Sequence, residues 1–202
     1  LVLVAAIAAG VLINTAGFLQ TQAEQTGQDS SSQVANNINV IGEVGEVNSS
    51  NNGTDIVRLT VQRSPGSDNV DLSELSIQYV GDNGFENLIH NTSQDNDDSG
   101  TATYGVELIT ADSDDDAVMT DDADRYQIII PFAGSFNSPE VNVTDASADE
   151  SGEIGLNSAS LTVLQTGQEA EMEITTADRA TRNAFIQAPD TLDVDDGDTI
   201  GL

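Results

Sequence analysis

The stretch "LVLVAAIAAGVLINTAGFLQ", residues 1–20, decides the fold class of this chain. Residues 1–19 carry no charge, and as an α-helix they would span about 28 Å, close to the hydrocarbon thickness of a bilayer. Many of them are Ala or Gly, and small residues let helix backbones approach closely, while a polar side chain such as Asn14 can hydrogen-bond across a helix interface. The run therefore predicts a helix that packs against other helices.

The helical pattern continues at lower hydropathy beyond residue 20. Small and apolar residues recur at three- and four-residue steps from Leu12 to Ile38, and Gln and Asp residues occupy the opposite face. We therefore predict one helix from residue 1 to about residue 35. The alternative is a helix that ends near Gln20 and is followed by a Gln- and Ser-rich linker. No Met, basic segment or A-x-A site flanks the run, so a conventional signal peptide is not expected.

From about residue 38 apolar residues alternate with polar ones, which is typical of β-strands. Seven such segments are separated by polar, acidic turns: residues 38–47, 55–63, 72–80, 103–110, 125–132, 159–167 and 169–176. Many short strands joined by polar turns favour an antiparallel sandwich. The predicted fold class is thus α+β, with a long hydrophobic helix over 1–37 and an all-β, antiparallel, immunoglobulin-like sandwich domain over 38–202.

The composition is strongly acidic. The 202 residues contain 35 Asp and Glu, five Arg and no Lys, which gives a net charge of −30. Phosphate recognition needs cationic side chains, so nucleic acid is not expected as a partner. Copies of the chain would repel each other at low salt, but at 1 M salt the Debye length falls to about 3 Å and this repulsion largely disappears. The charge favours adaptation to very salty surroundings over an ordinary acidic secreted protein.

The sequence contains no catalytic pattern. There is no Cys, which leaves no disulfide, thiolate metal site or Cys nucleophile, and His90 is the single His. Most nucleophile and general-base arrangements therefore lack a member. P-loop and dinucleotide-binding fingerprints are also absent. We expect a protein that is not an enzyme and requires no cofactor.

One acidic turn, "DNDDSG", is a weak candidate for a structural cation site. Asp95, Asp97 and Ser99 hold the first, third and fifth positions of a calcium-binding loop. The twelfth position is Val106, so the pattern lacks its bidentate carboxylate. A solvated surface loop is the alternative interpretation.

Four N-x-S/T sequons, the acceptor pattern for N-glycosylation, lie in or beside predicted turns of the β part. They begin at Asn48, Asn52, Asn91 and Asn142. Chance alone predicts about three in a chain with this much Asn, Ser and Thr, so their placement matters more than their number. Glycans at these turns would face outward, and we expect at least two of the sites to be occupied.

The residues quoted first resemble a known family. Residues 1–20 are similar to the N-terminal segment of the archaeal flagellins, or archaellins, of halophilic archaea, and the similarity extends more loosely to about residue 47. The stretch "AAGVLINTAG" is a specific match, whereas the β part matches only in character. The resemblance implies a structural subunit that assembles through its helix into the archaellum, an extracellular rotating filament for swimming motility.

The resemblance also implies how such a subunit is made and packed. The precursor would be type IV pilin-like and transiently inserted in the membrane, with a mature N-terminus upstream of Leu1. Copies would form a helical polymer, with paralogous archaellins and with motor and envelope proteins of the archaellum as further partners. The β-domains would form the outer sheath. The residues that we expect to pack in the filament core are Leu3, Ile7, Gly10, Val11, Asn14, Gly17 and Phe18.

Two alternatives share some of these features. An adhesion pilin would have the same helix core and outer β-domain but would form a type IV pilus-like filament for attachment. A surface-layer or binding protein with a single membrane anchor would form no filament and would tolerate a Leu-rich replacement of residues 1–19.

Overall fold

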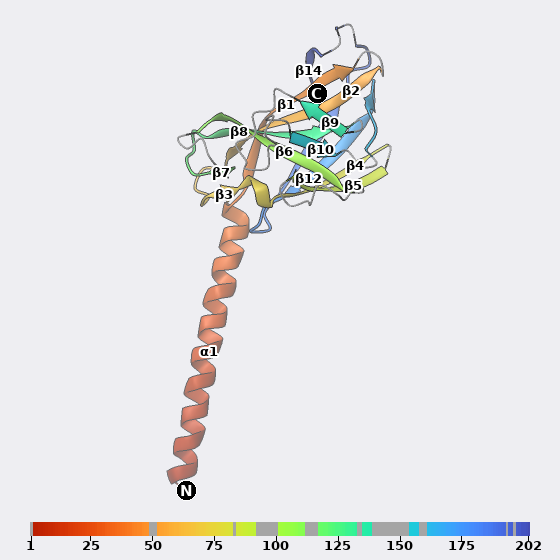
Figure 1. The fold of residues 1–202 in the computed structure, drawn as a ribbon. Helices are drawn as coiled ribbons and strands as arrows, with labels where there is room; N and C mark the ends of the chain where they lie inside the picture. Colours follow the sequence, from red (N-terminus) through yellow and green to blue (C-terminus); the bar gives the residue numbers. More distant parts are fainter. Residues whose placement is uncertain are drawn as a thin grey trace.

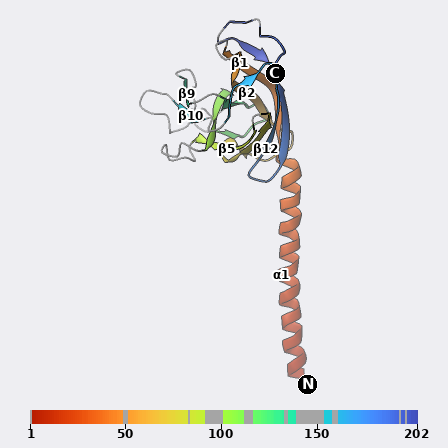
Figure 2. The same ribbon diagram turned by 90° about the vertical axis from the view of Figure 1, so that its right-hand side faces the viewer.

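The computed structural model describes residues 2–48, 52–82, 84–91, 101–111, 117–132, 135–138, 154–157, 161–192, 194–195 and 197–202. A single helix, α1 (Val2–Ala35), projects from one end of a β-region that contains all the described strands (Figures 1 and 2). The prediction of one helix that continues to about residue 35 is confirmed. The alternative of a linker after Gln20 is wrong, because α1 runs without a break through the Gln- and Ser-rich stretch.

The β-region is built around one ten-stranded sheet. Its strands are β1 (Ile38–Asn48), β2 (Gly53–Arg63), β4 (Ser76–Gly81), β5 (Gly84–His90), β6 (Ala102–Thr110), β8 (Arg125–Pro131), β11 (Leu164–Gln165), β12 (Glu169–Thr175), β13 (Thr181–Gln187) and β14 (Thr199–Gly201). Two small antiparallel pairs lie beside this sheet: β3 (Val70–Asp71) with β7 (Val118–Met119), and β9 (Ser135–Ser138) with β10 (Ile154–Asn157). A 3-10 helix, η1 (Leu72–Glu74), precedes β4.

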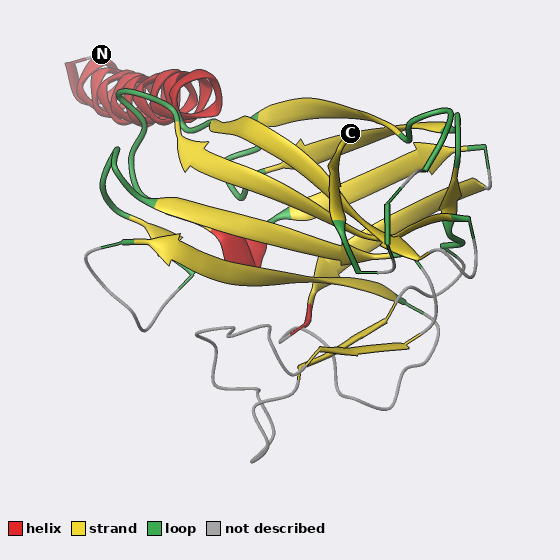
Figure 3. Ribbon diagram, turned by 90° about the horizontal axis from the view of Figure 1, so that it is seen from above, coloured by secondary structure: helices red, strands yellow, loops and turns green. Residues whose placement is uncertain are grey.

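The main sheet is mostly antiparallel and curled. Its order is β13-β12-β4-β5-β6-β8-β2-β1-β14, β11 pairs with β2, and the one parallel pair is β5 with β6. The view from above shows the strands curling around a common interior (Figure 3). The curl brings β13 towards β1, where the Arg182 guanidinium donates to Asn39 Oδ1 at 3.4 Å. The described strands thus form a half-barrel, and the predicted pair of facing sheets in an immunoglobulin-like sandwich is not shown. Alternating burial cannot separate the two folds, because both turn every second side chain inward.

The inner face of the curled sheet holds the core. On β12, Ala170, Met172 and Ile174 are buried, while Glu173 between them faces solvent. The ring of Tyr104 is buried, and its hydroxyl donates to the carbonyls of Leu72 and Leu75 at 2.9 Å each. Burial raises the pKa of Tyr104, so the phenol stays a neutral donor. The core lies within the β-region, and no residue of α1 is buried in it.

Two of the strands are shorter than the segments predicted from the sequence. Residues 72–80 form η1 and then β4, because the Asp71 carboxylate accepts from the Ser73 backbone N–H at 2.8 Å and caps the 3-10 turn. Among the described residues of 159–167, only Leu164 and Gln165 form a strand, β11.

Candidate assembly surface

Helix α1 exposes its apolar side chains along its whole length. None of its residues is buried, although residues 2–19 are almost entirely apolar. Ile7 is 61% exposed and Phe18 is 69% exposed. Contiguous apolar surface of this extent on a soluble protein marks a surface that another molecule or a membrane covers. By length and composition α1 could also span a membrane.

The seven residues predicted to pack in a core lie on one face of α1. At 100° per residue, their spacing places them within an arc of about 120°. The four large apolar members are between 60% and 73% exposed. A Cβ added at Gly10 or Gly17 would meet no atom within 4 Å outside the backbone of the helix itself. The glycines therefore leave two shallow notches in an exposed apolar face, and they serve no contact within the described chain.

Several polar side chains of α1 form hydrogen bonds within the helix. The hydroxyls of Thr15, Thr21 and Thr26 donate to the carbonyls four residues earlier, at 2.8, 3.1 and 2.9 Å. The Gln20 amide donates to the Glu24 carboxylate at 3.0 Å. These local bonds lower the cost of moving the helix into an apolar environment.

A polar junction joins α1 to the β-region. Asn36 is only 4% exposed, and its Nδ2 donates to Asp178 Oδ2 at 2.8 Å. Its Oδ1 accepts from the backbone N–H of Asp68, also at 2.8 Å. Gln33 Nε2 donates to the carbonyl of Arg179 at 3.2 Å. The last turn of α1 is thereby bonded to the β12–β13 hairpin and to the segment that precedes β3.

Sequence reasoning missed this junction. The helix was predicted to end near residue 35, and Asn is a residue that commonly ends helices. The bonding partner of Asn36 is 142 residues away in the sequence, however, and no local pattern points to it.

The predicted glycosylation acceptors have different surroundings. Asn48 ends β1, and its Nδ2 donates to the Asp55 carboxylate. Asn52 is exposed in the turn before β2 with a left-handed φ of 52°, a conformation that Asn tolerates well. Asn91 follows β5 and is half-buried. Asn142 lies outside the described residues, so the structure does not place it.

The candidate cation ligands Asp95, Asp97 and Ser99 also lie outside the described residues. Within the part of the chain that the structure describes, no group of three His, Asp or Glu side chains is placed to hold a metal ion.

The sequence is similar to known proteins along its length, including the exposed helix α1. The archaeal-type flagellin family matches residues 1–191. This chain belongs to the archaeal-type flagellins. It is 42% identical over 140 residues to flagellin A2 of Halobacterium salinarum, which covers 68% of this chain and 68% of that protein. It is 32% identical over 212 residues to flagellin A1 of Haloferax volcanii, which covers 100% of this chain and 90% of that protein.

A solved structure shares the fold. The archaeal flagellum of Methanospirillum hungatei strain JF1 matches with a TM-score of 0.60 over 95% of this chain and 88% of that one, at 13% identity. The predicted resemblance to archaellins of halophilic archaea is confirmed. The protein is therefore a non-enzymatic structural subunit of the archaellum, the extracellular motility filament, and paralogous flagellins occur in a single halophilic species.

Proposed function

We propose that residues 2–19 of α1 form the core of the archaellum by packing against the same helix of neighbouring copies. In this assignment residues 1–37 are the core segment and residues 38–202 are the outer domain of the filament. Leu3, Ile7, Gly10, Val11, Asn14, Gly17 and Phe18 form the contact face, with the glycines allowing close approach of the backbones.

The observation that carries this proposal is the full exposure of α1. Nine large apolar side chains of residues 2–19 face solvent in the isolated chain. Complete burial of such a side chain is worth about 1.5–3 kcal/mol. Together they could contribute about 13–27 kcal/mol, against the roughly 4–15 kcal/mol that association costs in lost translational and rotational freedom. Burial of α1 is thus the main favourable contribution to polymerisation.

The same helix suits a membrane stage before assembly. Residues 2–19 would span about 27 Å as a helix, which is close to the hydrocarbon thickness of a bilayer. We propose that a membrane-inserted precursor supplies subunits to the base of the filament, where archaellum motor and envelope proteins would contact them. The assembly is a packing process and requires no cofactor.

Two surface properties of the β-region suit a place on the outside of the filament. Asn48 and Asn52 lie at the end of β1 opposite the junction with α1, so glycans there would point away from the core. The net charge of −30 also favours a solvated outer layer in concentrated salt.

A gene deletion in the host tests the role in motility. With paralogues deleted as well, loss of archaella and of swimming in native brine, restored by this gene, supports the proposal. A helix variant such as Gly10→Leu, expressed at the same level, should fail to restore either. Restored swimming by a chain with a Leu-rich replacement of residues 2–19 would overturn the proposed role of the small-residue face.

A further inference from the structure

We propose that Arg179 forms an ion pair with a helix carboxylate, Glu24 or Asp29, of a neighbouring copy in the filament. This inference rests on the proposed function, because it requires copies to pack along α1. In this inference, the β12–β13 hairpin of one subunit contacts the helix of a neighbouring subunit. The contact fixes the position of the outer domain relative to that helix.

The backbone at Arg179 does not favour an arginine. The residue closes the β12–β13 turn, where Thr176 N–H donates to the Ala180 carbonyl and Arg179 N–H donates to the Thr176 carbonyl, both at 2.9 Å. Its φ is 66°, in the left-handed region that Gly adopts without strain. Hairpin turns of this kind usually place Gly at that position. A charged side chain at a strained position points to a function for that side chain.

The guanidinium of Arg179 has no carboxylate partner among the described residues. It is exposed, and no Asp or Glu oxygen of the residues that the structure describes lies within 4 Å of it. The adjacent carboxylate of Asp178 is already bonded to Asn36 Nδ2.

The half-buried arginines contrast with Arg179. Arg58 lies 3.2 Å from Glu46 and 3.5 Å from Glu107, and Arg63 lies 2.6 Å from Asp122. Arg125 donates to two backbone carbonyls of its own turn. Arg182, exposed on β13, donates to Asn39 across the opening of the half-barrel. Among the described residues, Arg179 is the one arginine of the five whose guanidinium forms no hydrogen bond or ion pair.

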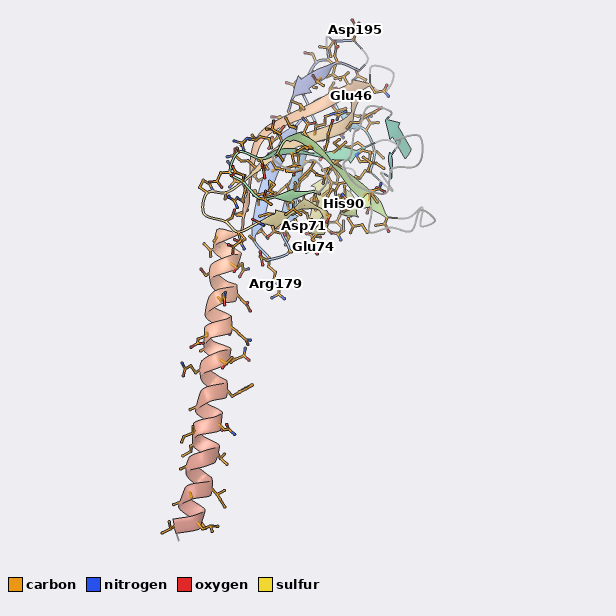
Figure 4. All side chains as sticks on the ribbon, turned by 60° about the vertical axis from the view of Figure 1, so that its left-hand side comes forward. Glu46, Asp71, Glu74, His90, Arg179 and Asp195 are labelled. Carbon is orange, nitrogen blue, oxygen red and sulfur yellow. The ribbon has the colours of Figure 1, made fainter. Side chains whose placement is uncertain are left out.

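The hairpin holds Arg179 beside the helix. Arg179 and Asp29 line a polar groove of about 450 Å³ between α1 and the β12–β13 turn. The Gln33 amide bonds to the carbonyl of Arg179 and so anchors the turn to the helix. The Arg179 side chain points away from the sheet and along α1 (Figure 4). A second helix that packs along the Asp29 side of α1 would pass beside this guanidinium.

The chemistry of α1 identifies the partner. Its charged residues are Glu24 and Asp29, and both are acidic. Any neighbouring helix therefore offers carboxylates and no cation. At molar salt, screening removes attraction beyond about 3 Å, so only a guanidinium in direct contact with the carboxylate contributes. A hydrogen-bonded Arg–carboxylate pair meets this condition.

The first test separates the effect of the Arg179 side chain on assembly from its effect on folding. Arg179→Gly suits the left-handed backbone, so the melting temperature of the detergent-solubilised full chain should stay the same or rise. Isolated filaments of this variant should dissociate, on dilution of the brine, at about twofold higher salt than wild-type filaments. Arg179→Lys should dissociate close to the wild type. Arg182→Gln, which changes the net charge by the same amount on the same hairpin, should also match the wild type.

Unchanged filaments from Arg179→Gly would overturn the inference, and so would an equal shift in Arg182→Gln. A charge exchange then identifies the partner. Arg179→Glu should reduce the number of filaments per cell, and a second change, Glu24→Arg or Asp29→Arg, should restore it. Restoration by either one supports the ion pair and names the carboxylate, whereas restoration by neither contradicts it. If Arg179 variants are normal while Gly10→Leu blocks assembly, the inference fails and the proposed function stands.

Discussion

The side-chain amide of Asn36 donates to the carboxylate of Asp178 at 2.8 Å, one residue after α1 ends. Asn36 also accepts from the backbone N–H of Asp68, and its own carbonyl accepts from the hydroxyl of Thr176 at 3.3 Å. One nearly buried residue thus bonds the end of the helix to two separate parts of the β-region. These bonds set the direction in which α1 leaves the β-region.

Asn36→Asp should destabilise this junction without changing its size. The change removes the Nδ2 donor and places a second carboxylate against Asp178, so we expect a loss of about 1–3 kcal/mol in unfolding free energy. Denaturant unfolding of the full chain in detergent measures it. The matched control is Gln28→Glu, the same amide-to-acid change at an exposed site of α1 outside the junction, with an expected effect within about 0.5 kcal/mol. Equal losses in both variants would argue against a special role for Asn36.

Gly53→Ala should destabilise the contact between β2 and β11. An added Cβ would lie 2.4 Å from Val163 Cγ1 and 2.6 Å from the backbone carbonyl oxygen of Leu164. The backbone cannot move aside cheaply, so we expect a loss of about 1–3 kcal/mol. Gly42→Ala is the control, because its Cβ would make an ordinary contact of 3.7 Å with Thr60 Cβ. The Asn52 sequon survives the change, so a difference in stability would not reflect lost glycosylation.

Glu43→Gln should stabilise the protein near neutral pH. Burial raises the pKa of Glu43 above its ordinary value of 4.5. A carboxyl whose pKa is higher in the folded state contributes its stability below pH 4.5, and that contribution is lost as the pH rises through the folded-state pKa. The variant should therefore melt at a higher temperature than the wild type near pH 7, and the difference should vanish near pH 4. Glu173→Gln, at an exposed site on β12, is the control for the loss of one carboxylate, and its effect on unfolding free energy should stay within about 0.5 kcal/mol.

Gly10→Leu should block filament assembly while leaving the β-region folded. The position has open space in the single chain, so the larger side chain costs nothing on folding. It would hold neighbouring helices apart, and a loss of about 1.4 kcal/mol per contact already reduces association tenfold. Electron microscopy of cells and circular dichroism of the purified chain measure the two properties. Gly10→Ala adds only one methyl group and should still assemble. Normal filaments from Gly10→Leu would contradict close helix packing at this residue.

The sequence predicted the elements whose local pattern is strong. The uncharged run and the small-to-apolar stripe predicted α1 to within a residue or two. Period-two patterns of apolar residues, strictest in β12, predicted β2, β6, β8 and β12. Strand β13 was missed, because Arg182 and Phe185 face solvent and only Ala184 and Ile186 are buried. The half-barrel could not be predicted, because it depends on pairings such as β4 with β12, which join residues about ninety positions apart in the sequence.

The assembly surface was also predictable only where it depends on a local sequence pattern. The apolar face of α1 was predicted because small, uncharged residues at helical spacing are typical of helices that pack closely against other helices. The roles of Asn36 and Arg179 were not, since both depend on the β12–β13 hairpin, which the fold brings beside the end of the helix. Local sequence patterns therefore predicted the surface that we propose drives assembly, and the structure revealed the contacts that we propose orient it.

Cysteine labelling tests the central claim most directly, because the natural chain has no Cys. Ala8→Cys places a thiol on the exposed apolar part of α1, and Asp195→Cys places one at the end of the β-region opposite the helix (Figure 4). Intact filaments and dissociated subunits of each variant would be treated with a maleimide reagent. We predict that Cys at position 8 reacts only after dissociation, whereas Cys at position 195 reacts in both states. Rapid labelling of position 8 in intact filaments would contradict a helix core.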